Sequence, residues 1–144
     1  MAKSSAYSAK NVAATLDGQT VIGLWDDDNA IEVAPVEDTG TLIVGADGSS
    51  IFSQSASEAA TITLRLQHTS PTHRLLHQKL ARQRAKGVRI TGFPFTVIDT
   101  DSNEGGSTDQ VFIQSWPTDA KGKAATVREW VLVTGNWRPE IPRV

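Results

Sequence analysis

The sequence contains no cysteine and no long run of apolar residues. Disulfide bonds and metal sites built on thiolates are therefore excluded. No apolar run approaches the roughly 20 residues that a membrane-spanning helix needs. Residues 1–10 are small and polar and lack the apolar core of a signal peptide. We therefore expect a protein that is made in, and acts from, an aqueous compartment, without membrane insertion by this chain.

The sequence also lacks acidic residues between Arg65 and Arg89, where seven basic residues occur. The first 64 residues carry 2 Lys+Arg against 9 Asp+Glu, and residues 90–144 carry 5 against 7, so the net charge of the whole chain is only -2. Free basic DNA binders carry a positive total instead. A nearly neutral chain with such an uneven charge is suited to contact copies of itself or a patterned partner.

Length and composition indicate one globular domain. The 144 residues are 39% hydrophobic and 21% charged, which is enough apolar material for one core. Neither a repeat nor a low-complexity linker interrupts the chain. We therefore expect a single domain over residues 1–144.

Most of the chain has the pattern of β-strands. The clearest period-two alternation predicts that Ile62, Leu64 and Leu66 point into the core. Two glycines and an Asp-Gly step in Gly45–Ser50 tolerate positive φ, which predicts a hairpin at about residues 39–60. The strands expected in the first half of the chain cover residues 7–16, 20–25, 30–36, 39–44, 51–52 and 61–66.

The hydrophobic period then changes to that of a helix. Leu75, Leu76 and Leu80 mark one face of a helix around residues 71–86. Ser70 is the expected N-cap, before Pro71 in the first turn, and Gly87 is the expected C-cap. Further strands are expected over residues 88–98, 110–116 and 126–134, followed by an extended C-terminal arm from about residue 135. This order predicts a mainly β fold, an antiparallel β-barrel or sandwich with one flanking α-helix.

Histidines and acidic residues suggest metal chemistry only weakly. His73 and His77 have the spacing of two metal ligands on a helix, but Arg74 stands where a metalloprotease has glutamate. We interpret both histidines as part of a solvated helix face. The segment Asp99–Asn103 begins like a calcium loop, yet Glu104 replaces the required glycine and Gln110 the closing glutamate. A polar hairpin loop is the better interpretation.

The remaining charged clusters also indicate surfaces rather than chemistry. Asp26–Asp28 has the pattern of a solvated turn. The basic helix lacks the interleaved aromatic residues of a nucleic-acid binder, so we interpret it as an outer face or a face that meets an acidic patch on a neighbour. We expect no catalytic residues, no bound metal and no cofactor.

The four tryptophans divide into two pairs. Trp116 and Trp130 lie in expected strands and are predicted to be in the core. Trp25 and Trp137 lie near a turn and in the tail, where aromatic anchors of interfaces also occur. Both a core position and an interface position are open for this second pair.

From residue 45 the chain reads GADGSSIFSQSASEAATITLRL, followed by Thr69-Ser70-Pro71 and a leucine-bearing helix. Together with the first and closing strands, this order resembles the tail tube proteins of contractile-tailed bacteriophages over nearly the whole chain. The resemblance implies a β-barrel or sandwich flanked by one helix. It further implies that six copies form a ring with a continuous inner barrel, and that rings stack into a hollow tube inside a contractile sheath.

The resemblance also implies roles for particular residues. The residues expected in an inter-ring stacking hairpin are Gly45, Ala46, Asp47, Gly48 and Ser49. The residues expected to line the lumen are Glu32, Ser53, Ser55 and Glu58. The residues expected on an outer or inter-subunit basic face are Arg82, Arg84 and Lys86.

The implied partners are further copies of this chain, a sheath protein, and baseplate and tail terminator proteins. DNA would pass through the lumen without specific binding. The expected location is the virion tail, after synthesis in the cytoplasm of the bacterial host. Three alternatives remain: a secreted tube protein of a type VI secretion-like apparatus, a monomeric ligand-binding β-sandwich that uses Trp25 or Trp137, and a small hydrolase that uses His73 or His77.

Overall fold

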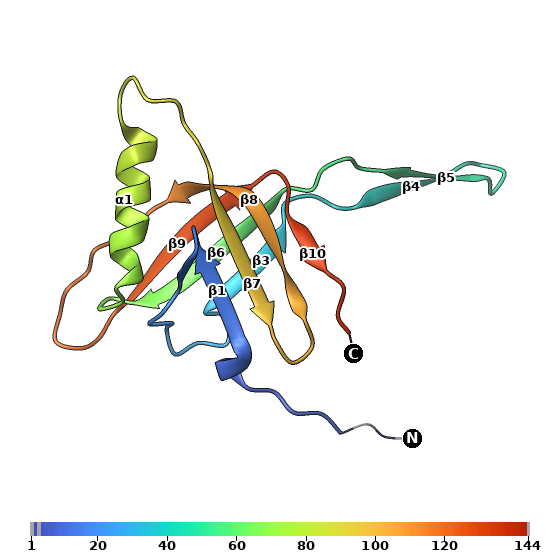
Figure 1. Cartoon of the computed structure of the whole chain (residues 1–144). Helices are drawn as coiled ribbons and strands as arrows, with labels where there is room; N and C mark the ends of the chain where they lie inside the picture. Colours follow the sequence, from blue (N-terminus) through green and yellow to red (C-terminus); the bar gives the residue numbers. More distant parts are fainter. Residues whose placement is uncertain (1, 3, 144) are drawn as a thin grey trace.

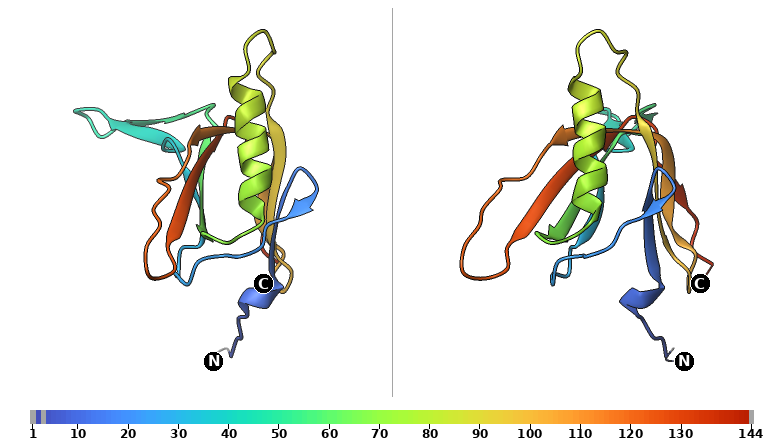
Figure 2. Two further views of the ribbon diagram at one scale, coloured as in Figure 1. Left: turned by 90° about the vertical axis from the view of Figure 1, so that its left-hand side faces the viewer. Right: turned by 60° about the vertical axis from the view of Figure 1, so that its left-hand side comes forward.

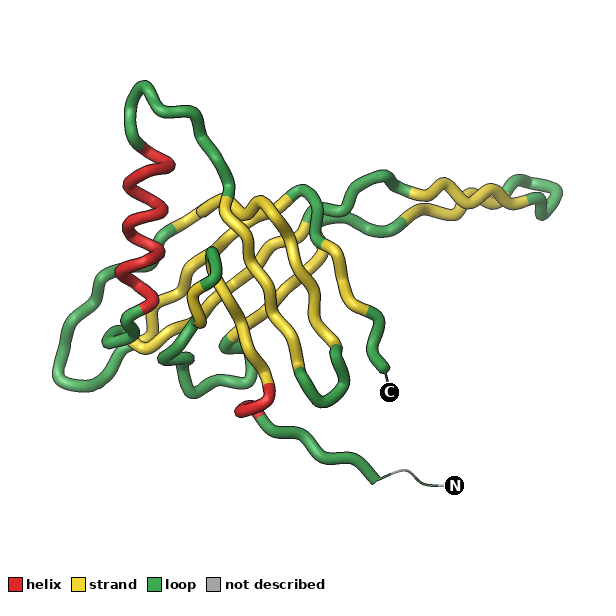
Figure 3. The backbone as a smooth tube through the Cα atoms, viewed as in Figure 1, coloured by secondary structure: helices red, strands yellow, loops and turns green. Residues whose placement is uncertain are grey.

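The computed structural model describes residues 2 and 4–143, of which strands make up the largest part (Figures 1 and 3). The chain is 45% strand and 11% helix. The order of elements is η1 Ala9–Asn11, β1 Val12–Leu16, β2 Gln19–Thr20, β3 Ile31–Pro35, β4 Gly40–Val44, β5 Ser50–Gln54, β6 Ala60–Gln67, α1 Thr72–Arg84, β7 Phe93–Asp99, β8 Glu104–Ser115, β9 Val127–Thr134 and β10 Arg138–Glu140. The predicted mainly β fold with one flanking α-helix is confirmed.

The main sheet is antiparallel, in the order β2-β1-β7-β8-β9-β6-β3, with β10 on the other side of β8. It folds into two layers because β8 changes partner along its length. Its first part pairs with β7, from Glu104 to Val111, whereas Phe112 and Ile113 pair with β9. Within the described residues β2 and β3 do not pair with each other, so the fold is a sandwich rather than a closed barrel.

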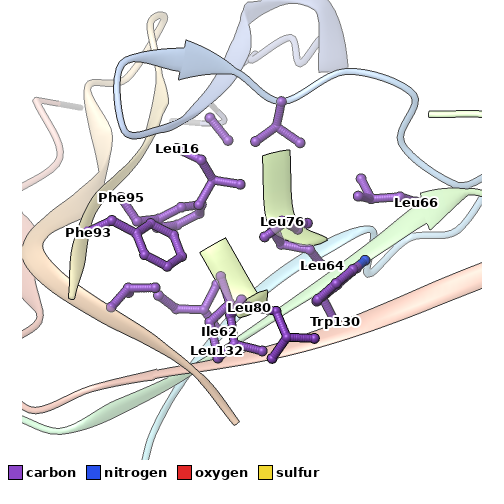
Figure 4. Close-up of a cluster of buried hydrophobic side chains, with 14 residues drawn as sticks. Leu16, Ile62, Leu64, Leu66, Leu76, Leu80, Phe93, Phe95, Trp130 and Leu132 are labelled. Atoms are coloured by element: carbon purple, nitrogen blue, oxygen red, sulfur yellow. The ribbon is translucent and has the colours of Figure 1, made fainter. Parts of the chain in front are cut away.

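The core lies between the two layers and under α1 (Figure 4). Ile62, Leu64 and Leu66 of β6 are fully buried, which confirms the predicted alternation. Side chains from the other elements complete the cluster, chiefly Leu16, Leu76, Leu80, Phe93, Phe95, Trp130 and Leu132. Burying one side chain of this size contributes roughly 1.5–3 kcal/mol, so this cluster is the main source of stability.

Helix α1 begins and ends slightly inside the predicted bounds. The N-cap position is Pro71 rather than Ser70, although the Ser70 hydroxyl accepts a hydrogen bond from the Thr72 N–H (3.2 Å). The same hydroxyl donates to the Ile22 carbonyl, which connects the start of α1 to the segment after β2. The C-cap is Ala85, because the backbone is already extended there, and Gly87 lies in the following loop with a φ of 73°.

Four predicted strands differ from the observed strands by about five or more residues at one end. The first starts at Val12 because Ala9–Asn11 forms a 3-10 turn. Residues 21–25 form only an isolated bridge after β2. Strand β7 starts at Phe93, since residues 85–92 form an exposed loop. Strand β8 starts earlier than predicted, because Asn103 adopts a φ of 58° and closes a tight turn.

Hairpin β4–β5 projects away from the sandwich, on the side opposite to α1 (Figures 1 and 2). Its two strands pair only with each other within the described residues. The hairpin projects across the direction in which α1 runs, as Figure 1 and the left view of Figure 2 show. It is therefore an arm and not part of the core.

Candidate assembly surfaces

The hairpin exposes an unusual amount of apolar surface. Its large apolar side chains are all more than half exposed: Leu42 62%, Ile43 61%, Val44 62%, Ile51 67% and Phe52 58%. Leu42 lies opposite Phe52, and Ile43 lies opposite Ile51. Because successive side chains of a strand point to opposite faces, both faces of the hairpin are apolar. Surfaces of this kind mark contacts with other molecules.

The tip of the hairpin consists of the residues that the sequence predicts. The Gly45 N–H donates to the Ser49 carbonyl (2.6 Å), and the Gly48 N–H donates to the Gly45 carbonyl (3.1 Å). Gly48 has a φ of 88°, a conformation that L side chains rarely adopt. The Ser49 N–H donates to Oδ1 of Asp47 (3.0 Å) and holds the pKa of that carboxyl below its ordinary value. The tip therefore carries a negative charge in a well-defined turn.

The root of the hairpin is fixed by backbone hydrogen bonds. The Ser55 N–H donates to the Thr39 carbonyl (2.7 Å), and the Trp137 N–H donates to the Glu58 carbonyl (3.0 Å). The Trp137 ring lies against Gly106, where an added Cβ would be 2.5 Å from Cζ2 of the ring. A groove of about 680 Å³ opens at this root, and Val33, Pro35, Glu37, Gln54, Trp137 and Pro139 are among its lining residues.

Glu32 lies on the face of the sheet that points away from the core. Arg65 lies between two carboxylates there, with Nη1 3.2 Å from Glu32 Oε2 and Nε 3.1 Å from Glu129 Oε2. Strands β3, β6 and β9 supply one residue each to this charged cluster, and the same face also carries Val131 and Val133 of β9, opposite Thr63 and Thr61. It is an open surface and not a pocket.

The other predicted lumen residues lie elsewhere. Ser53 belongs to β5, opposite Thr41, on the projecting hairpin. Ser55 and Glu58 line the root groove. The structure therefore does not bring these three residues together with Glu32 within one copy.

The predicted basic face forms at the C-terminal end of α1. Arg82 and Arg84 belong to its last turn, Lys86 follows in the loop, and all three are exposed. None of the three forms an ion pair with another described residue. Lys79, by contrast, pairs with Asp17 (2.5 Å), so only part of the basic run remains available.

The interpretation of His73 as a solvated residue is wrong, because its side chain is buried. Its Nε2 lies 2.8 Å from the Gln67 carbonyl, and its Nδ1 accepts a hydrogen bond from Nε1 of Trp130 (3.0 Å). Burial lowers the pKa of His73, although the Gln67 contact opposes this effect. The ring is therefore neutral, with the proton on Nε2, and its role is structural. Its spacing from Leu76 and Leu80 places it on the buried stripe, a signal that the sequence contains.

The tryptophans also differ from expectation. Trp130 is fully buried, as predicted, but Trp116 is 57% exposed, so its predicted core position is wrong. Trp116 follows the last residue of β8, beyond the part of the strand that packs on the core. Trp137 is partly buried against the core, with its ring centroid 6.2 Å from that of Phe95.

The remaining motifs form ordinary turns. The Asp101 N–H donates to Asp99 Oδ1 (3.1 Å) in the turn between β7 and β8. No group of three or more potential metal ligands occurs among residues 2 and 4–143. Of the helices that the structure describes, none has the length and apolarity needed to cross a membrane.

Comparison with protein families identifies one matching family. A model of the bacteriophage PhiTE tail tube protein family matches residues 4–139. A search of curated proteins finds no match.

Solved structures with the same fold come from injection machines and phage-like particles. The sheath/tube terminator of an extracellular contractile injection system, PVC, in its extended state has a TM-score of 0.69, with 14% identity over 97% of this chain and 100% of that chain. A chain in the virion of a native gene transfer agent particle has a TM-score of 0.62, with 17% identity over 94% of this chain and 100% of that chain. A chain in the PVC sheath-tube complex, also in the extended state, has a TM-score of 0.60, with 14% identity over 92% of this chain and 90% of that chain. At these identities the similarity shows the fold alone.

Proposed function

This chain belongs to the bacteriophage PhiTE tail tube protein family, and we propose that it is the repeating structural subunit of a phage tail tube. Homohexameric rings stack into a hollow conduit for DNA delivery inside a contractile sheath, and the chain performs no catalysis. The observation that carries the proposal is hairpin β4–β5. Its two apolar faces are uncovered within the described chain and require a neighbouring molecule.

The apolar surface of the hairpin is large enough to contribute substantially to assembly. Covering one large apolar side chain contributes roughly 1.5–3 kcal/mol. Association costs an estimated 4–15 kcal/mol in lost freedom of movement. Burial of the five exposed side chains of β4 and β5 therefore offsets much of this cost. In the proposal the tip, Gly45–Ser49, reaches the next ring and contributes to stacking.

The lumen wall is proposed to be the outer face of β3, β6 and β9. This face carries Glu32 and Glu129 on either side of Arg65, which leaves it weakly acidic, so that it repels DNA rather than binding it. Strand β3 ends the sheet and has a free edge among the described residues. Edges of this kind are normally covered, and pairing between copies in a ring covers them.

The other proposed lumen residues belong to the hairpin and its root. Ser53, Ser55 and Glu58 join the wall where the hairpin of one copy crosses the sheet of another. The segment between β5 and β6 is small and polar, which suits a smooth wall. Helix α1, whose last turn carries Arg82 and Arg84 just before Lys86, lies on the opposite side of the sandwich from the hairpin (Figure 1). These three residues are proposed to form an outer or inter-subunit face.

The proposed partners are the sheath, the baseplate and the tail terminator, and the proposed location is the phage tail. The similarity in fold to the PVC sheath-tube complex and sheath/tube terminator supports these partners. The same similarity also favours a second candidate function, a terminator ring that ends a tube. A terminator forms one ring at the end of a tube, whereas a tube subunit forms many stacked rings along the tube.

Electron microscopy of the purified chain, with light scattering on a sizing column, distinguishes these functions. Long hollow tubes are expected for the tube subunit. Single six-fold rings that never stack would support the terminator. A monomer at all concentrations up to the millimolar range, with or without a purified baseplate, would contradict both and favour a ligand-binding sandwich.

A further inference from the structure

Several charged side chains form an ion pair within the chain, which neutralises them. Arg65 pairs with Glu32 and Glu129, and Lys79 pairs with Asp17. Further ion pairs join Arg128 and Lys121 to Asp119, and Arg138 to Asp109. The charged clusters that remain without such a partner among the described residues are therefore informative about other molecules.

One such cluster is basic and lies at the C-terminal end of α1. It consists of Arg82, Arg84, Lys86 and Arg89, which we call the basic end. All four side chains are exposed, and none forms an ion pair with a described residue. The Gln83 side chain fixes this end to the sheet, because its amide both donates to the Ile113 carbonyl (2.9 Å) and accepts from the Ile113 N–H (3.0 Å). The last turn of α1, with Arg82 and Arg84, is thus held in a defined position, and Lys86 and Arg89 follow in the loop.

The second cluster is acidic and consists of Asp26, Asp27 and Asp28, which we call the acidic end. All three are exposed and without an ion pair in the described part of the chain. The turn is anchored by the Trp25 N–H, which donates to the Arg65 carbonyl (3.0 Å).

The two ends lie at opposite extremes of the molecule along the direction of α1. In Figure 1 the loop after α1 is at the top and the turn after Trp25 is near the bottom, and Figure 2 keeps this separation in both views. Hairpin β4–β5 projects across this direction. If the hairpin points along the tube axis to the next ring, the line between the two charged ends runs across that axis. The two ends then face neighbours in the same ring rather than neighbours in the next ring.

We propose that the basic end of one copy contacts the acidic end of the next copy around the ring. This inference rests on the proposed tube function and adds the surfaces that close each ring. The contact is head-to-tail, and a head-to-tail contact closes into a ring when the rotation between copies allows it. Opposite charges across an interface favour this pairing and disfavour the reversed orientation, in which like charges meet.

Charge-reversal variants test the contact. The first variant carries R82E, R84E, K86E and R89E, so that both of its ends are acidic. The second carries D26K, D27K and D28K, so that both of its ends are basic. At a concentration where the wild type is assembled, the number of rings formed by each variant alone is expected to fall at least about tenfold. The reason is that like charges then face each other at every contact. Mass photometry and electron microscopy count rings, tubes and monomers.

Mixing the two variants in equal amounts is the decisive experiment for the charged contact. Alternating copies present opposite charges at every contact, and a ring of six accommodates this alternation. The mixture is therefore expected to recover rings. A matched control carries R74E and K123E, which add negative charge at exposed positions outside the basic end and are expected to leave ring formation unchanged. Circular dichroism melting of every variant checks that it is folded.

The outcomes separate this inference from the proposed function. If the wild type forms tubes and both reversals form rings as well as the wild type does, the charged contact is wrong while the tube function stands. If both reversals lose rings but the mixture does not recover them, complementary pairing of the two ends is wrong. If the wild type forms neither rings nor tubes, the tube function itself is contradicted.

Discussion

At the scale of single residues, His73 is the position where the chemistry differs most from the sequence pattern. Its spacing to His77 resembles a metal pair, yet both ring nitrogens are engaged inside the protein, by Trp130 and by the Gln67 carbonyl. His77 remains exposed and contacts the Trp130 ring edge-on, with 4.9 Å between ring centroids. The pair is divided between the core and the surface, so it cannot act as one site.

The lowered pKa of His73 predicts a pH-dependent stability. As the pH falls below the ordinary histidine value of 6.5, the unfolded chain binds a proton at this position before the folded chain does. The free energy of unfolding should therefore decrease from about pH 7 downwards and be insensitive to this group above it. Urea unfolding at a series of pH values measures this. His73→Gln should reduce the slope, and His77→Gln should retain it; equal slopes in wild type and His73→Gln would contradict the assignment.

Gly106 is a second residue with a specific packing role. Any side chain there would meet the Trp137 ring at 2.5 Å. Gly106→Val should therefore destabilise the protein by about 1–3 kcal/mol through overpacking. Gly122→Ala is the matched control, because nothing lies within 4 Å of an added Cβ there, and it should change stability by less than about 0.5 kcal/mol. Denaturant melts of both variants check this, and equal effects would contradict the packing role.

At the scale of elements, the sequence predicts the strands, helices and turns whose residue pattern lies within the element itself. Strand β6 follows from alternation, the helix from its leucines, and the turn Gly45–Ser49 from its glycines and Asp47. The start of β8 is not predictable in this way, because residues 104–110 are polar and small. They form a strand only because β7 and β10 pair with them, which is a long-range effect. The root groove depends equally on Trp137 arriving from the other end of the chain.

The hairpin surface predicts a separation between folding and stacking. Leu42→Ser combined with Phe52→Ser removes one apolar face of an arm that packs against nothing within the described chain. The melting temperature should stay nearly constant, whereas tubes should shorten to rings at the concentration where the wild type forms tubes. Thr41→Ser is the conservative control on the same strand. Electron microscopy measures tube length, and unchanged tubes in the double variant would contradict the hairpin's role.

A bulky tip tests the same element at its far end. Asp47→Trp with Gly48→Val places large side chains in the turn, and Val cannot adopt the φ of 88° at position 48 without strain. The sandwich should remain folded, because the tip lies outside the core, while stacking should be blocked. Normal melting together with absent tubes is the expected result. Long tubes formed by this variant would show that the tip does not reach the next ring.

At the scale of the whole molecule, charge is the property that the sequence reveals best. Composition gives a net charge of only -2, and the order of the residues shows that the basic and acidic residues are separated along the chain. The structure adds that Arg65 and Lys79 are neutralised internally, so the basic surface is smaller than the sequence suggests and is concentrated at the C-terminal end of α1. The sequence could not distinguish a barrel from a sandwich, since this depends on where β8 exchanges β7 for β9. It also could not show that the hairpin lies across the direction of α1.

The central claim is that this chain forms stacked hollow rings linked by hairpin β4–β5. Cryo-electron microscopy of the purified, assembled protein tests it most directly. The account predicts rings of six, a central bore lined by β3, β6 and β9, and each hairpin buried against a copy in the next ring. Assemblies without a bore, or tubes in which the apolar hairpin stays exposed to solvent, would contradict it.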